Sequence, residues 1–140
     1  WDTLTGRLLL TLSGHTRWVN ACDFSPDGTR VVTTSNDTTV RVWNAENGTL
    51  LFVLEGHTSS VWGCAFSPNG ERIVTAGDDR KARVWCTETG ECQLIIEGEH
   101  TDELSCCCFS HDGKYILTSS CDRTTRLWNA MDGTLIKTLR

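Results

Sequence analysis

Apolar and polar residues alternate over short stretches of this chain, and turn-forming residues separate the stretches. In the first full example, one stretch ends near Phe24, and three more cover residues 30–35, 38–43 and 49–54. The separating turns contain Pro-Asp-Gly, Pro-Asn-Gly or Asn-Gly sequences. A period of two between such turns is typical of half-buried β-strands, and no helical period of 3.6 persists. The pattern therefore predicts an all-β chain with four strands in each unit.

The same pattern recurs along the chain. The tryptophans Trp1, Trp43, Trp85 and Trp128 are separated by 42, 42 and 43 residues, and a Phe-Ser-x-x-Gly turn recurs with them. Units of four strands with a period of about 40–45 residues are typical of the blades of a β-propeller. We therefore expect three four-stranded antiparallel blades, at residues 13–54, 55–97 and 98–140.

These motifs together resemble the WD-repeat (WD40) family over the whole chain. The Trp-Asp dipeptide remains at Trp1-Asp2, and the later repeats have Trp-Asn, Trp-Cys and Trp-Asn instead. The resemblance implies a structural tetrad in each blade, in which Asp accepts a hydrogen bond from His, His contacts the Thr hydroxyl, and Thr contacts the Trp indole N–H. The matching residues are His15, Thr33, Asp37 and Trp43; His57, Thr75, Asp79 and Trp85; and His100, Thr118, Asp122 and Trp128.

A His, Thr and Asp set could also form a nucleophilic triad. However, this set occurs three times with the same offsets of 18, 4 and 6 residues, whereas an active site is needed once. The sequence also lacks a Gly-rich phosphate loop and metal-ligand spacing. We therefore interpret the sets as structural, and expect neither enzymatic activity nor a cofactor or metal ion.

The resemblance also implies a face for binding partners, on the loops that carry the His and Asp residues. The matching positions lie three and five residues after each His and one residue before each Asp. They are Trp18, Asn20 and Asn36; Ser60, Trp62 and Asp78; and Glu103, Ser105 and Cys121. The two tryptophans could be binding hot spots or could pack under neighbouring loops. The acidic residues would favour a peptide that carries Arg or Lys.

Composition indicates which class of partner the chain is expected to bind and in which cellular compartment we expect it. The net charge is -5 and no Lys/Arg-rich run exists, so nucleic acid is not an expected partner. No apolar run approaches the roughly 20 residues of a membrane span, and no signal peptide is recognisable at the start. The eight cysteines contain no Cys-x-x-Cys pair, which favours free thiols in a reducing, cytoplasmic environment.

Three of the cysteines occupy equivalent positions in the repeats. Cys22, Cys64 and Cys107 each lie two residues before the phenylalanine that ends the first strand. A free cysteine behaves as a small apolar residue, so we expect these three to pack in the core. Cys106 and Cys108 should then point to the opposite face of their strand.

The predicted strands do not add up to a closed propeller. Residues 1–12 align with the end of a third strand and a complete fourth strand, so they predict one additional outer strand that belongs to a preceding or shared blade. Closed propellers typically have about 4–8 blades, and three are too few. Two interpretations remain: the chain is part of a larger propeller, or it completes a ring with further chains. In self-assembly, the additional strand would compete with the last strand of the next copy.

These features predict a scaffold that presents a rigid propeller surface to protein or peptide partners. The alternative is a regulatory or sensory propeller segment of a larger multidomain signalling protein, whose catalytic domain lies outside this chain. The sequence alone does not discriminate between these functions, because a fold does not define a function.

Overall fold

The computed structural model describes residues 1–140 and contains twelve β-strands in three antiparallel sheets. The first sheet contains β1 (Val19–Phe24), β2 (Arg30–Ser35), β3 (Val40–Asn44) and β4 (Leu50–Leu54). The second contains β5 (Val61–Phe66), β6 (Arg72–Gly77), β7 (Ala82–Cys86) and β8 (Cys92–Ile96). The third contains β9 (Leu104–Phe109), β10 (Tyr115–Ser120), β11 (Thr125–Asn129) and β12 (Leu135–Leu139).

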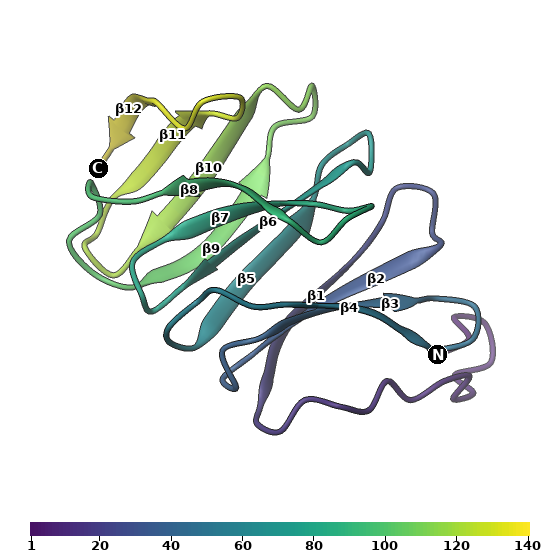
Figure 1. Ribbon diagram of the computed structural model, residues 1–140. Helices are drawn as coiled ribbons and strands as arrows, with labels where there is room; N and C mark the ends of the chain where they lie inside the picture. The colour runs from purple at the N-terminus through teal and green to yellow at the C-terminus, as the bar shows by residue number, and fades with distance from the viewer.

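The three sheets are successive blades of an open arc (Figure 1). Within each blade the strands lie side by side in chain order, and each pairs with the next. The first strands of the blades lie beside one another, β1 against β5 and β5 against β9. The chain begins at the first blade and ends at the third, so the two termini lie at opposite ends of the arc. The prediction of three four-stranded antiparallel blades is confirmed.

The strands begin and end close to the predicted positions. The predicted strand at 30–35 coincides with β2, whereas the strand expected from residue 38 begins at Val40. The reason is that Thr38 has a φ of 71° and lies in the tight turn between β2 and β3. Arg80 and Arg123 hold the same position in the other blades, with φ values of 61° and 67°. A positive φ cannot continue a strand, so the turn extends two residues further than the sequence pattern indicates.

The predicted additional outer strand is not formed. Residues 7–12 run extended beside the first blade but have no strand partner. Leu10 and Leu12 nevertheless lie 3.4–3.8 Å from the point where a Cβ on Gly48 would sit. Phe52 and Leu54 approach Gly90 in the same way, as do Leu94 and Ile96 at Gly133. The segment therefore occupies the place of an outer strand in a preceding blade, but it lacks the inner strands with which it would pair.

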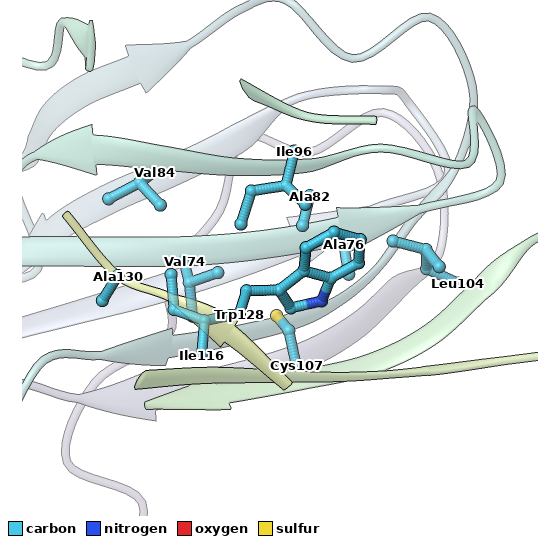
Figure 2. Packing of buried hydrophobic residues seen from close by; sticks show 10 residues of the cluster. All are labelled: Val74, Ala76, Ala82, Val84, Ile96, Leu104, Cys107, Ile116, Trp128 and Ala130. Atoms are coloured by element: carbon cyan, nitrogen blue, oxygen red, sulfur yellow. The ribbon is translucent and has the colours of Figure 1, made fainter. Parts of the chain in front are cut away.

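The hydrophobic core lies between the blades. One cluster joins the first and second blades and contains Val32, Val40, Val42, Leu54, Val61, Phe66, Ile73 and Trp85. The other joins the second and third blades and contains Val74, Ala76, Ala82, Val84, Ile96, Leu104, Cys107, Ile116, Trp128 and Ala130 (Figure 2). Because each blade buries its apolar face against its neighbour, a blade at either end of the arc has one face without a partner.

The cysteines reveal this difference between inner and terminal blades. Cys107 is buried and Cys64 packs against the first cluster, but Cys22 is exposed. The expectation that Cys22 packs in the core was wrong for this arc, in which no other blade covers that side of β1. Cys106 and Cys108 are exposed, which agrees with their expected position on the opposite face of β9. The structure has no helix with the length and apolar character needed to cross a membrane.

Candidate functional site

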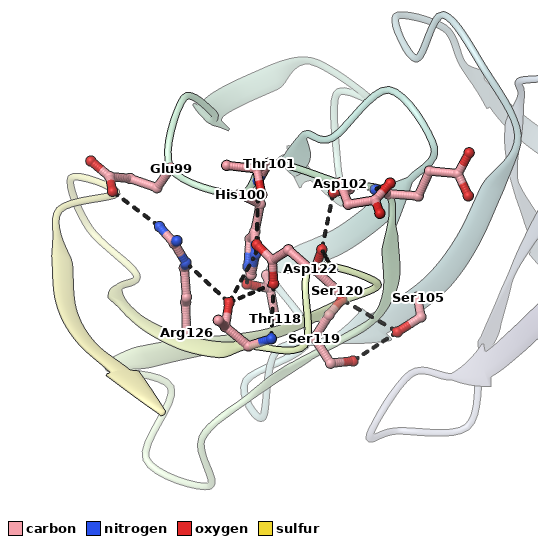
Figure 3. A network of polar contacts seen from close by, with 12 residues as sticks. Glu99, His100, Thr101, Asp102, Ser105, Thr118, Ser119, Ser120, Asp122 and Arg126 are labelled. Atoms are coloured by element: carbon pink, nitrogen blue, oxygen red, sulfur yellow. Dashed lines mark hydrogen bonds and ion pairs between the residues drawn. The ribbon is translucent and has the colours of Figure 1, made fainter. Parts of the chain in front are cut away.

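Each tetrad forms a continuous chain of hydrogen bonds beneath the loops. In the second blade, His57 Nδ1 lies 2.9 Å from Asp79 Oδ2, and His57 Nε2 lies 2.8 Å from Thr75 Oγ1. Trp85 Nε1 donates to Thr75 Oγ1 over 2.9 Å. The same three distances are 2.9, 2.8 and 2.9 Å in the first blade. They are 2.8, 2.8 and 2.8 Å in the third, part of which Figure 3 shows.

The order of donors in this chain follows from the tryptophan. An indole N–H can only donate, so the threonine oxygen accepts from it and the threonine O–H can donate to His Nε2. The other ring nitrogen then carries the proton and donates to the aspartate. Each link stabilises by about 1 kcal/mol, and a buried group left without a partner costs about 1–3 kcal/mol. The tetrads therefore fix the loops rigidly to the blades.

The aspartates of the tetrads are held in the charged form. Burial alone would raise the pKa of Asp37, but hydrogen bonds from Thr39 and the backbone N–H of Thr16 outweigh burial and lower it. The pKa values of Asp79 and Asp122 are also lowered, because their hydrogen bonds again exceed the effect of burial. Each aspartate accepts a hydrogen bond from its histidine and another from the backbone amide of the residue that follows this histidine. The charged carboxylate thus connects the loop that carries the histidine to the turn that carries the aspartate in the same blade.

The predicted partner-face residues come together in pairs above the tetrads. In every blade, the residue before the aspartate donates its backbone N–H to the carbonyl oxygen of the residue three positions after the histidine. The pairs are Asn36 with Trp18, Asp78 with Ser60, and Cys121 with Glu103, each at 2.9 Å. The repeat thus brings these six residues into three equivalent positions on one face of the arc.

The residues five positions after the histidines make different contacts. Asn20 donates its side-chain amide to Asn36 Oδ1 over 2.6 Å and to the carbonyl oxygen of Val61 over 2.9 Å. Trp62 donates its indole N–H to Asp78 Oδ1. Ser105 contacts the hydroxyl of Ser119 at 3.0 Å (Figure 3). The first two side chains are therefore fixed by their pairs, and the first pair also connects two blades.

The two additional tryptophans differ in exposure. Trp18 has 79% of its surface exposed, and Trp62 has 42%. Within this arc no neighbouring loop covers Trp18. Trp62 is held by Asp78 and still presents part of its ring to solvent. Exposed indoles beside rigidly held loops suit the binding of another protein, since such a partner would bury them with little loss of conformational freedom.

Some residues that connect the blades were not singled out from the sequence. Arg30 Nη1 donates to the carbonyl oxygen of Thr87 over 2.5 Å, and Arg72 Nη1 donates to that of Ala130 over 2.6 Å. Asp23 Oδ2 accepts the backbone N–H of Phe66 over 2.8 Å. The two arginines hold the same position in their repeats, and the third repeat has Tyr115 there. The recurrence of a basic side chain at one repeat position is the sequence signal by which these contacts could have been found.

Comparison with known proteins gives matches along most of the chain. The family model "WD domain, G-beta repeat" matches residues 6–44, 48–86 and 90–129. Lissencephaly-1 homolog 1 of Paramecium tetraurelia is 52% identical over 44 residues, which cover 31% of this chain and 11% of that protein. Nuclear distribution protein PAC1 of Arthroderma benhamiae is 48% identical over 44 residues, or 31% and 10% of the two chains.

The name of a third relative contains a second domain besides the WD repeat. WD repeat and SOCS box-containing protein 1 of Homo sapiens is 49% identical over 45 residues, which cover 31% of this chain and 11% of that protein. The similarity to each of these relatives thus extends over about one repeat, and the matched part of this chain covers about a tenth of each relative.

Proposed function

Because the chain belongs to the WD40 family, we propose that it is a scaffold that binds protein or peptide partners through the loop face carrying Trp18 and Trp62. WD40 repeats in general mediate protein–protein interactions and are generally non-catalytic. The observation that supports this site is the pair of exposed indoles, with Trp18 in the loop before β1 and Trp62 at the start of β5, beside loops anchored by the tetrads. Tryptophan is strongly enriched among residues whose truncation weakens binding most, which makes this face the strongest candidate on the arc.

Selection of peptide ligands tests this proposal without a known partner. A phage-displayed library of random peptides is selected on the full chain, and the affinities of the selected peptides are measured by fluorescence anisotropy. We expect Trp18→Ala or Trp62→Ala to weaken binding by about thirtyfold, since truncation of a hot-spot residue costs about 2 kcal/mol.

The control is a substitution at the opposite end of the blades. Met131 has 88% of its surface exposed and lies in the turn between β11 and β12, away from the loops of the tetrads. Met131→Ala should leave the affinities unchanged. If Met131→Ala weakens binding and the tryptophan variants do not, the binding face lies at the other end of the blades and the proposed site is wrong.

We also propose that further blades complete the arc into a ring. The support is the pair of uncovered faces at the two ends of the arc, together with the small share of each relative that the chain matches. A hollow of about 640 Å³ beside the first blade is lined mainly by apolar side chains, among them Leu10, Phe24 and Val31. In the interior of the arc, apolar residues of a neighbouring blade occupy the equivalent space.

A reducing, cytoplasmic environment is part of the proposal. All eight cysteines are free, including the consecutive Cys106, Cys107 and Cys108. Free thiols in this number suit a compartment in which disulfides do not persist. Acidic composition and the absence of a basic run argue for protein rather than nucleic acid as the partner.

A further inference from the structure

Arg83 in the second blade is a buried cation without a carboxylate to pair with it. Only 9% of its surface is exposed, and its Nε has no hydrogen-bond partner. None of the ion pairs of the chain includes this guanidinium. Burial of an unpaired charge is costly, so the surroundings of Arg83 favour an anion.

The equivalent arginine of the third blade has both of the partners that Arg83 lacks. Arg126 Nη1 donates to Glu99 Oε2 over 3.0 Å (Figure 3). Arg126 Nε donates to Thr124 Oγ1 over 3.3 Å. The second repeat has no equivalent of Glu99, which is an additional residue before the histidine of the third repeat, and it has Lys81 in place of Thr124. The missing contacts of Arg83 therefore follow from two differences between the repeats.

A cysteine supplies the one hydrogen-bond acceptor of the Arg83 side chain. Arg83 Nη1 lies 3.8 Å from Cys92 Sγ, at the start of β8. The equivalent residues of the other two blades are Leu50 and Leu135. A thiol sulfur is a weak acceptor and compensates little of the buried charge. Cys92 is exposed, so small reagents in solution can reach the sulfur beside the guanidinium.

We propose that Cys92 is a site of oxidation by peroxides, and that the sulfinate formed there pairs with Arg83. In the first step an S–O bond forms while the O–O bond of the peroxide breaks. The sulfur loses two electrons to the peroxide, and the thiol proton leaves with the second oxygen as water or an alcohol. A second peroxide molecule oxidises the sulfenic acid to the sulfinic acid in the same way, and the sulfinic acid gives its proton to the solvent.

A sulfinate has the negative charge and the two oxygen acceptors of a carboxylate. It would give Arg83 the anion that Glu99 gives Arg126 in the third blade. Charge-assisted hydrogen bonds of this kind are roughly twice as strong as bonds between neutral groups. The guanidinium therefore favours the oxidised sulfur over the thiol. Both residues belong to the middle blade, so the site does not depend on what covers the two ends of the arc.

Oxidation of the full chain by hydrogen peroxide, followed by mass spectrometry of its peptides, measures sulfinate formation at each cysteine. Arg83→Met removes the charge and should slow this reaction at Cys92 by about tenfold, the effect of a hydrogen bond to a charged group. The exposed thiol of Cys121 in the third blade should react as before. Arg41→Met is the matched control, because Arg41 also forms no ion pair but the first blade has Leu50 in place of the cysteine. Equal rates at Cys92 in the two arginine variants would overturn the proposal.

Replacement of Cys92 by aspartate tests the pairing without peroxide and without a change at the arginine. Aspartate resembles a cysteine sulfinate in charge and shape, and asparagine has nearly the same shape without the charge. We expect the equilibrium constant for urea unfolding to be about tenfold lower in Cys92→Asp than in Cys92→Asn at neutral pH. The difference should disappear when Arg83→Met is added to both variants. If Cys92→Asp is no more stable than Cys92→Asn, Arg83 does not hold an anion at this position and the proposal is wrong.

Discussion

Arg72 of the second blade donates to the carbonyl oxygen of Ala130 in the third blade, with 2.6 Å between Nη1 and O. The same guanidinium lies 5.4 Å from the centre of the Phe109 ring. One side chain thus connects two blades by a charged hydrogen bond and by contact with an aromatic face. The equivalent bond from Arg30 connects the first two blades. The blades of the arc are therefore held together by a repeated polar contact beside the apolar core.

Replacement of this arginine should weaken the contact between the second and third blades. Arg72→Ala removes the bond to Ala130 and should lower the free energy of unfolding by about 1–3 kcal/mol, as for a hydrogen bond to a charged group. Urea unfolding followed by tryptophan fluorescence measures the loss. Lys114→Ala is the control, because Lys114 lies on the surface and its 3.8 Å pair with Asp112 contributes little. Equal losses in the two variants would show that the contact between blades does not stabilise the fold.

Replacement of the threonine at the centre of a tetrad should destabilise the chain more than replacement of a threonine at its edge. Thr75→Val keeps the shape but leaves His57 Nε2 and Trp85 Nε1 without partners, and both atoms lie inside the blade. Each unpaired group costs about 1–3 kcal/mol, so we expect a loss of at least about 2 kcal/mol in urea unfolding. Thr58→Val removes an exposed hydroxyl that makes no hydrogen bond, and it should change stability by less than about 0.5 kcal/mol.

Acid should destabilise the arc through the aspartates of the tetrads. The pKa values of Asp37, Asp79 and Asp122 are lower in the folded chain than the value of about 3.9 of an unfolded aspartate. A lowered folded pKa contributes stability that is fully present above the unfolded pKa and is lost as pH falls below it. The free energy of unfolding should therefore decrease from about pH 4 downwards.

Circular dichroism during urea unfolding at a series of pH values would measure this dependence. Asp79→Asn removes the contribution of one tetrad, so its stability should be lower at neutral pH and should fall less steeply in acid. A variant with the full acid dependence of the unchanged chain would show that the Asp79 carboxylate does not contribute.

The cysteines should react with alkylating agents in an order set by burial and hydrogen bonding. Hydrogen bonds from the side chain and backbone of Thr89 lower the pKa of Cys86. Burial raises the pKa of Cys64 and of Cys107. Since the thiolate is the reactive form, iodoacetamide at neutral pH should modify Cys86 early and the two buried thiols last.

Mass spectrometry of peptides from a time course would give the rate at each cysteine. Thr89→Ala should slow the modification of Cys86, because it removes the hydrogen bond that contributes most to the lowered pKa. Modification of Cys107 as fast as that of Cys86 in the folded chain would contradict the burial of β9 against the second blade.

The sequence by itself predicted the three blades and the residues of the tetrads. The alternation of apolar and polar residues, the turn signals and the period of 42 or 43 residues are local properties that recur in each repeat. The offsets between His57, Thr75, Asp79 and Trp85 are also fixed within one blade. For that reason the three tetrads have nearly identical hydrogen-bond distances.

Only the tertiary structure decided what depends on the neighbouring blade. Cys22, Cys64 and Cys107 occupy the same sequence position, yet Cys22 is exposed because no other blade of this arc covers that side of β1. Residues 7–12 have the pattern of an outer strand but form none, because strand formation requires a partner to accept and donate backbone hydrogen bonds. The bonds from Arg30 and Arg72 depend likewise on the carbonyl groups of an adjacent blade. A repeated sequence therefore defines each blade, whereas burial and pairing at its two faces are defined by the neighbour that covers them.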